Sequence, residues 1–323
     1  MSYLIRKTDT FLRNWKKNPD RYPLIIKGAR QVGKTYSILE FGRSHYENVA
    51  YFNFETNPKL NETFEENISP DYLIPILSHI AGQTIVKEKT LIVFDEVQLC
   101  ERALTSLKYF CEDAPDYHII VAGSLLGVAV NRAKFSFPVG KVDMKTLYPM
   151  DMEEFMLALG EDDLVEQIKK CFQTDTPLPS ALHDAAMQLY RQYLVVGGMP
   201  ECVMQFVQTG DYILIRHTQD TILTSYLNDM SKYNNLNEIK KTRLAYDNIT
   251  VQLSKKNTRF QYKLIKKGGR ASEFENAIEW LCLSGIVSQV YKVEQIKKPL
   301  ENYRDIDAFK IYVSDLGLLC AKR

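Results

Sequence analysis

The chain has 323 residues, of which 45% are hydrophobic and 25% are charged, with 41 basic and 40 acidic side chains. This composition is that of a globular protein of two or three domains, and the near-zero net charge excludes a global field that would draw it to nucleic acid or anionic lipid. Neither a signal peptide nor an apolar run of about 18 residues is found, so we expect a cytoplasmic protein with no membrane partner.

The first predicted elements are a short apolar strand at residues 24–26, a glycine-rich loop and a helix. The loop reads Gly28-Ala29-Arg30-Gln31-Val32-Gly33-Lys34-Thr35 and fits the phosphate-binding pattern G-x-x-x-x-G-K-[S/T]. Its glycines let successive backbone N–H groups point at a phosphate, and the dipole of the following helix adds positive potential. Lys34 can reach the β- and γ-phosphates, and Thr35 offers a hydroxyl to Mg²⁺. The sequence thus predicts that these residues, with Tyr36, bind ATP and Mg²⁺.

A strand is expected at residues 48–54, and the apolar strand after it ends in two carboxylates. Leu91-Ile92-Val93-Phe94-Asp95-Glu96 is typical of a buried central strand of a parallel sheet, which delivers its acids to the carboxyl edge. Asp95 follows Lys34 by 61 residues and is predicted to hold Mg²⁺ through a water. Glu96 is predicted to polarise the water that attacks the γ-phosphate. The pair therefore indicates an ATP hydrolase.

Two further strands complete the predicted sheet. The strand at residues 118–122 ends in Gly123-Ser124, where additional-strand ATPases place a polar residue that senses the γ-phosphate, so Ser124 is the predicted sensor. The last strand is expected at residues 141–147. The five strands with helical crossovers predict an α/β fold, the parallel sheet of a P-loop NTPase.

Three basic residues, Arg132, Lys134 and Lys141, lie after the strand at residues 118–122 or at the start of the last strand. Each could neutralise the charge of the transition state, in this subunit or in a neighbouring one. Solvated surface is the common alternative for such residues. Arg132 is the preferred candidate.

The predicted ATPase core covers residues 1–148, and a helical lid is expected at 149–230. Asp151 should cap a helix over 152–159, and Gly160 should end it.

Residues 231–295 then predict a winged-helix domain, because short helices precede a hairpin. Ser272 and Glu275 fit a capping box, and Phe274, Ile278 and Leu281 share one face of the expected helix. A strand is expected at residues 286–291.

Residues 255–270 carry seven basic residues and no acidic one, a composition that would suit a phosphate backbone. The helix that should enter a DNA groove argues otherwise, because Glu273, Glu275 and Glu279 would be repelled by phosphates. We therefore favour a protein partner or a homo-oligomer as the partner of this domain, with DNA as the less favoured alternative.

Five motifs in this order and spacing resemble a bacterial and archaeal family of AAA-type ATPases, related to the AAA+ and STAND proteins. They are Gly28-Ala29-Arg30-Gln31-Val32-Gly33-Lys34-Thr35, Phe94-Asp95-Glu96-Val97-Gln98, Phe137-Pro138-Val139-Gly140-Lys141, Val196-Gly197-Gly198-Met199-Pro200-Glu201 and Asp315-Leu316-Gly317-Leu318-Leu319. The resemblance covers nearly the whole chain. It implies that Lys34, Thr35, Asp95 and Glu96 form the ATP site and that a winged helix follows the lid.

In that family the ATPase domain is joined to a domain of unknown function whose far end resembles a nuclease-like fold. Similar proteins continue for about another hundred residues after the last motif. Residues 296–323 are therefore expected to begin a truncated C-terminal domain, and we assign no nuclease activity to them.

The expected function is ATP hydrolysis in which the nucleotide state moves the lid and winged helix. The alternatives are a slow nucleotide-dependent switch that recruits a protein partner, and a DNA-coupled ATPase. A GTPase is less favoured because the sequence has no Asn-Lys-x-Asp tetrad.

Overall fold

A computed structural model of the chain describes residues 4–124, 126, 137–232, 236–256 and 259–322. The chain divides into two compact units, one of residues 6–148 and the other of residues 149–323 together with the first five residues. Within the described ranges, no helix has the length and apolar character needed to cross a bilayer.

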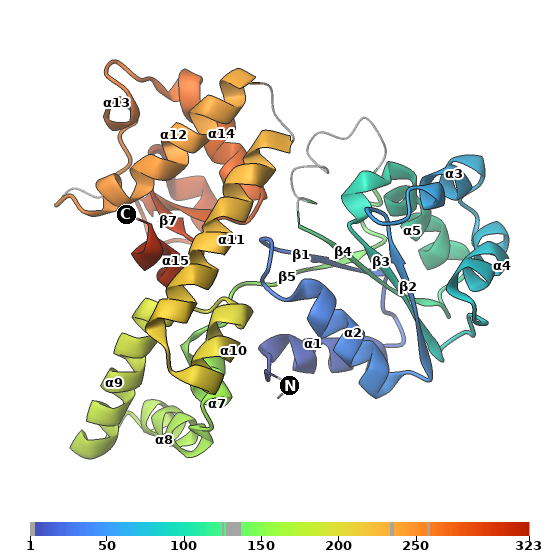
Figure 1. Cartoon of the computed structure of the whole chain (residues 1–323), viewed down its shortest axis with the longest axis horizontal. Helices are drawn as coiled ribbons and strands as arrows, with labels where there is room; N and C mark the ends of the chain where they lie inside the picture. Colours follow the sequence, from blue (N-terminus) through green and yellow to red (C-terminus); the bar gives the residue numbers. More distant parts are fainter. Residues whose placement is uncertain (1–3, 125, 127–136, 233–235, 257–258, 323) are drawn as a thin grey trace. The chain divides into compact units, whose positions relative to one another are not determined.

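The unit of residues 6–148 is built on a five-stranded sheet of order β2-β3-β4-β1-β5, in which all neighbouring strands are parallel (Figure 1). Its strands are β1 (Leu24–Lys27), β2 (Asn48–Asn53), β3 (Thr90–Asp95), β4 (His118–Gly123) and β5 (Asp143–Thr146). Every residue of β3 and β4 is buried, as their apolar runs require. The predicted five-stranded α/β sheet is confirmed.

Helices cover both faces of this sheet. They are α1 (Lys7–Lys17), α2 (Lys34–His45), α3 (Lys59–Glu66), α4 (Pro70–Ala81) and α5 (Glu101–Asp113), and a short 3-10 turn, η1 (Val97–Leu99), precedes α5. Gly42 of α2 lies against Leu91 on one face of β3. Helices α3, α4 and α5 share a core with Ile92 and Phe94, which point to the other face of that strand. In that core the rings of Phe54, Phe64 and Phe94 lie 5.5 to 5.9 Å apart. This packing fixes Phe94, the residue before Asp95 at the end of β3.

His118 begins β4 and is buried between polar partners. Its Nε2 contacts the guanidinium of Arg21, and its Nδ1 lies 2.7 Å from the hydroxyl of Tyr46. Because a guanidinium only donates, Nε2 is the acceptor and Nδ1 carries the single proton of the neutral ring. Burial, reinforced by the positive charges of Arg21 and Lys16, lowers the pKa of His118 to about 4.

We expect the stability of this unit to fall as the pH drops from 6.5, the ordinary pKa of histidine, towards about 4. Between these pH values the histidine of the unfolded chain binds a proton and the folded ring does not. The stability that the neutral His118 contributes is therefore complete above pH 6.5 and is lost progressively below it. The ring centroid of Trp15 lies 6.0 Å from that of His118, so its fluorescence during urea unfolding is the readout, in a Trp280→Phe background. His118→Gln should flatten the pH dependence in this window, and equal slopes in the two proteins would contradict the expectation.

The second unit begins with five helices. They are α7 (Met152–Ala158), α8 (Asp162–Gln173), α9 (Ser180–Val196), α10 (Pro200–Thr209) and α11 (Tyr212–Lys232). Asp151 caps α7 by accepting from the backbone N–H of Glu154 at 3.0 Å, and the Glu154 side chain accepts from the N–H of Asp151 at 3.1 Å. Gly160, just after the helix, has a φ of 80°. The predicted cap and stop are confirmed.

The rest of this unit has the element order of a winged helix. The elements are α12 (Leu236–Leu253), α13 (Tyr262–Ile265), α14 (Ala271–Leu283), β6 (Val287–Val293), the 3-10 turn η2 (Leu300–Tyr303), β7 (Arg304–Val313) and α15 (Leu316–Ala321). β6 and β7 form an antiparallel hairpin, and α12 contacts α14 and β7. The hairpin crosses the boundary expected at residue 295, and the domain boundaries themselves stay predictions.

The predicted face of α14 is confirmed, but the predicted capping box is wrong. Phe274, Ile278 and Leu281 are buried, as their spacing required. The helix begins at Ala271 with Arg270 as its N-cap and has no side-chain cap, so Ser272 lies already inside the first turn. In a capping box the serine is the N-cap itself, and its hydroxyl bonds to the backbone N–H of the third helical residue. Ser272 is not at the N-cap, so it does not form this bond.

Two of the sequence motifs meet inside this unit. Asp315 is 3% exposed, and its carboxylate accepts from the backbone N–H groups of Gly198 at 2.6 Å and Leu318 at 2.8 Å. Gln219 of α11 donates to the carbonyl of Val196 at 3.1 Å. Burial raises the pKa of the Asp315 carboxyl, although the N–H donors oppose this shift. These bonds join the turn between α9 and α10 to the start of α15.

Candidate nucleotide site

The glycine-rich loop leaves the carboxyl end of β1 and leads into α2, which begins at Lys34. Gln31 and Gly33 have φ values of 66° and 90°, so the loop turns through left-handed conformations. A Cβ at Gly28 would lie 2.1 Å from the carbonyl oxygen of Leu147, so only glycine fits against the segment after β5. This geometry is the close backbone turn that the sequence pattern predicted.

Lys34 lies inside the loop. Its ammonium donates to the carbonyls of Gly28 at 2.9 Å and Ala29 at 2.8 Å, and the residue is 7% exposed. An ammonium at this place has only a short movement to make towards a phosphate cradled by the loop. Tyr36, two residues after Lys34 in α2, is 47% exposed.

A buried arginine holds the loop from behind. Arg6 donates to the carbonyl of Val32 at 3.1 Å and to that of Tyr148 at 2.8 Å, so it ties the loop to the end of the β5 segment. Sequence reasoning missed Arg6. Its neighbours in the N-terminal stretch gave no signal, because the contact depends on where α1 packs.

The loop and β3 meet at Asp95, which is 4% exposed. One oxygen of its carboxylate, Oδ2, accepts from the hydroxyls of Thr35 and Tyr51, each at 2.8 Å. Burial is the main cause that raises the pKa of Tyr51 to about 12, and its hydrogen bond to Asp95 adds to the shift. Tyr51 therefore keeps its proton at neutral pH and donates a hydrogen bond to Asp95. The predicted Thr35 and Asp95 pair lies together, and Tyr51 of β2 is a partner that sequence reasoning missed.

Glu96 follows β3 in a left-handed conformation, with a φ of 52°. Its Oε2 accepts from the amide of Gln98 and from the hydroxyl of Ser124 at 3.4 Å. Ser124 directly follows β4, so the two neighbouring strands bring the predicted base and the predicted sensor together. Strained backbone of this kind gathers at functional sites.

Gln98 is a second residue that sequence reasoning left without a role. Its position two residues after Glu96 in the second motif was the available signal. A Cβ at Gly123 would lie 2.2 Å from Oε1 of Gln98, so the glycine makes room for this amide. That Oε1 is buried and has no hydrogen-bond partner among the described residues.

The three basic residues predicted to neutralise the charge of the transition state have different outcomes. Arg132 and Lys134 lie outside the described residues, and the role of Arg132 stays a prediction. Lys141 pairs with Glu112 at 3.0 Å and precedes β5, so it lies towards the edge opposite the carboxyl ends of the strands. It does not join Lys34 and Asp95 within this chain.

The donor set at this edge fits a magnesium ion better than a transition metal. Thr35 and Asp95 offer oxygen ligands 2.8 Å apart, and Mg²⁺ takes one or two such protein ligands and completes its shell with phosphates and water. Within the described part of the chain, no group of three or more His, Cys, Asp or Glu residues could hold a metal alone.

Comparison with known proteins found two family matches and several similar solved structures. Residues 20–156 match the family described as an AAA domain, and residues 187–323 match a domain of unknown function, DUF8612. No curated protein sequence matches the chain. A Walker-type ATPase of Pyrococcus abyssi, PABY2304, is similar over 99% of this chain and 96% of its own, with 13% identity and a TM-score of 0.59. The ORC2 protein of Aeropyrum pernix is similar over 98% of this chain and 93% of its own, with 10% identity and a TM-score of 0.49.

At such low identity the structural similarity to the Pyrococcus protein concerns the fold alone. The family matches carry the assignment further, because the AAA match contains the glycine-rich loop, Asp95 and Glu96. The chain therefore contains an AAA-type P-loop ATPase domain, which is followed by a C-terminal DUF8612 domain.

Proposed function

We propose that this protein binds ATP with Mg²⁺ in the loop of residues 28–35 and hydrolyses it. The observation that carries the proposal is the 2.8 Å hydrogen bond between Thr35 of the loop and Asp95 of β3, which unites the two halves of the site. The name of the Pyrococcus relative, a Walker-type ATPase, supports the same activity. When bound, Mg²⁺ would neutralise charge on the β- and γ-phosphates.

The residues of the chain have separate tasks in this proposal. The loop amides and Lys34 hold the phosphates, whereas the oxygens of Thr35 and Asp95 hold the ion. Glu96 accepts the proton of the attacking water, because phosphoryl transfer to water depends on positioning and on charge stabilisation. Ser124 lies within reach of Glu96 and senses the γ-phosphate. We infer that the unpartnered Oε1 of Gln98 helps to hold that water.

We further propose that the nucleotide state moves the helical region and winged helix, in a cytoplasmic protein. Division of the chain into two compact units supports this reading. A slow switch that recruits a partner protein is the alternative. The mass in size-exclusion chromatography, measured with and without a non-hydrolysable ATP analogue, distinguishes nucleotide-driven assembly from a constitutive monomer.

Lys34→Ala is the test of the binding step. We expect the affinity for ATP to fall by about 10- to 100-fold, because charge-assisted hydrogen bonds contribute about 1.5–3 kcal/mol each. Isothermal titration with ATP and Mg²⁺ measures the loss, and the ATPase rate should fall with it. Lys59→Ala, at an exposed position of α3, removes the same charge as a control. Wild-type affinity in Lys34→Ala would contradict the assignment of the loop.

A further inference from the structure

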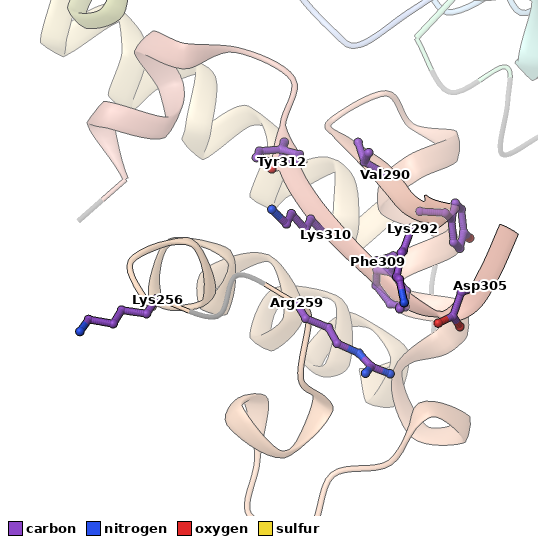
Figure 2. A pocket seen from close by; sticks show the side chains of 10 residues that line it. Lys256, Arg259, Val290, Lys292, Asp305, Phe309, Lys310 and Tyr312 are labelled. Carbon is purple, nitrogen blue, oxygen red and sulfur yellow. The ribbon is translucent and has the colours of Figure 1, made fainter. Parts of the chain in front are cut away.

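The C-terminal unit contains a cavity of about 580 Å³ beside its hairpin (Figure 2). It is bordered by residues of β6 and β7 and by Lys256 and Arg259, which follow α12. Its volume lies in the range of about 300–1,000 Å³ that is usual for ligand sites. Neither the AAA match nor the predicted nucleotide site includes any of its residues.

Strand pairing places several of the lining side chains on one face of the hairpin. Val290 pairs with Lys310 and Ser288 with Tyr312, so these residues share one face of the hairpin. That face is exposed, whereas the alternate residues Phe309 and Ile311 are buried. A register shift after Tyr291 then brings Lys292 opposite Asp305. The hairpin thus presents its polar and basic side chains on its uncovered face.

The cavity is positively charged. Lys256, Arg259, Lys292 and Lys310 line it together with a single carboxylate, Asp305, which accepts from the backbone N–H of Asp307 at 3.0 Å. Among the described residues, Lys292 and Lys310 have no ion-pair partner, whereas Lys266 nearby is paired with Glu273 at 2.9 Å. Lys256 extends away from the other labelled side chains in Figure 2 and lies at the rim. The cavity therefore contains two lysines, Lys292 and Lys310, that have no ion-pair partner among the described residues.

Aromatic rings lie beside these cations. Phe309 is stacked on Phe260 with ring centroids 5.4 Å apart, and Tyr291 lies 5.8 Å from Phe309. Tyr312 borders the same cavity and is 38% exposed. Phe260 and Phe309 are buried and support the hairpin, whereas the ring of Tyr312 is open to a ligand. Cations beside an exposed ring are the combination that receives phosphates and an unpaired base.

We propose that this cavity binds single-stranded nucleic acid, with phosphates at Arg259, Lys292 and Lys310 and a base against Tyr312. A single strand suits the site better than a duplex, because α14 presents Glu275 and Glu279 where groove-reading helices carry donors. The rings favour nucleic acid over an acidic peptide, which has no bases to stack. This proposal concerns a site separate from the ATP site and does not depend on ATP hydrolysis.

Fluorescence anisotropy of an end-labelled oligothymidylate of about 16 nucleotides, titrated with the full chain without ATP, tests the site. The double variant Lys292→Glu and Lys310→Glu should bind at least about 10-fold more weakly, because two phosphate contacts become repulsive. A control double variant, Lys170→Glu and Lys240→Glu, makes the same change of net charge at exposed positions of α8 and α12. Its affinity should stay near that of the wild type. Circular dichroism and the thermal midpoint verify that both double variants are folded.

The salt dependence gives a reading that a merely structural effect would not reproduce. Each phosphate contact with a single strand contributes about −0.7 to the slope of log K against log salt. Three contacts predict a wild-type slope near −2, and Lys292→Gln with Lys310→Gln should reduce its magnitude by about 1.4.

Stacking is tested separately. Tyr312→Leu should weaken binding by about 5-fold or more without changing the slope. Tyr190→Leu, at a similarly exposed tyrosine of α9, is the control and should bind normally.

Four results would overturn the proposal. They are no measurable binding by the wild type, equal losses in the two double variants, tighter binding of the matching duplex, and equal competition by polyglutamate of the same charge. The last would identify an acidic peptide as the occupant. Because no ATP is present, none of these results bears on ATP hydrolysis.

Discussion

Glu96→Gln is expected to lower the rate of ATP hydrolysis at saturating ATP by about 10²- to 10⁴-fold, the usual contribution of a general base. Glutamine keeps the size of the side chain and can still contact Ser124 and Gln98, but its amide cannot take the proton of the attacking water. Because Lys34, Thr35 and Asp95 are unchanged, the affinity for ATP should stay close to that of the wild type.

Phosphate release under single-turnover and steady-state conditions, together with titration of ATP, separates the two effects. Glu101→Gln is a matched control, since it removes a carboxylate at the exposed start of α5, five residues further along the chain. It should hydrolyse ATP at the wild-type rate. Unimpaired turnover in Glu96→Gln would remove Glu96 from the proposed mechanism, whereas a parallel loss of ATP affinity would indicate a structural role.

Much of this site could be predicted because it depends on local sequence and one rule of topology. The glycine pattern fixed the loop, and the apolar run before Asp95 identified a buried parallel strand, whose carboxyl end faces the loop in such sheets. Ser124 followed from the same rule applied to β4. The contact of Ser124 with Glu96 shows why the rule works: adjacent parallel strands end at one edge.

What the sequence did not reveal depends on contacts between distant elements. Tyr51 reaches Asp95 only because β2 is the neighbour of β3, and no pattern around Tyr51 states that order. Arg6, the N-cap of α1, contacts Val32 of the loop across 26 residues of the chain. The capping box expected at Ser272 failed for a related reason, because the helix starts two residues earlier than the box requires.

The meeting of the two C-terminal motifs has a steric basis. A Cβ at Gly198 would lie 1.9 Å from the carbonyl oxygen of Met150, and a Cβ at Gly317 would lie 2.3 Å from that of Val196. Both obstacles are backbone atoms, which cannot rotate away as a flexible side chain can. The glycines of these motifs are therefore explained by close packing of backbone in the second unit, without a role in nucleotide chemistry.

Gly198→Ala is accordingly expected to be strongly destabilising. The backbone N–H of Gly198 donates to the buried carboxylate of Asp315. The carbonyl of Gly198 accepts from the N–H of Met150 at 2.7 Å. Relieving the clash would stretch both bonds and leave a buried carboxylate short of a donor, which together should cost about 3 kcal/mol. For a unit of this size the thermal midpoint should fall by about 6–12 °C.

Gly210→Ala separates the steric cause from the cost of losing any glycine in this unit. Gly210 has a φ of 63° and no atom within 4 Å of its hypothetical Cβ, so alanine there meets only backbone strain of about 1 kcal/mol. Differential scanning calorimetry of the two variants should therefore show a fall several-fold larger for Gly198→Ala. Equal falls would mean that the turn before α10 adapts to a side chain, and that the contact with Asp315 does not hold α15 in place.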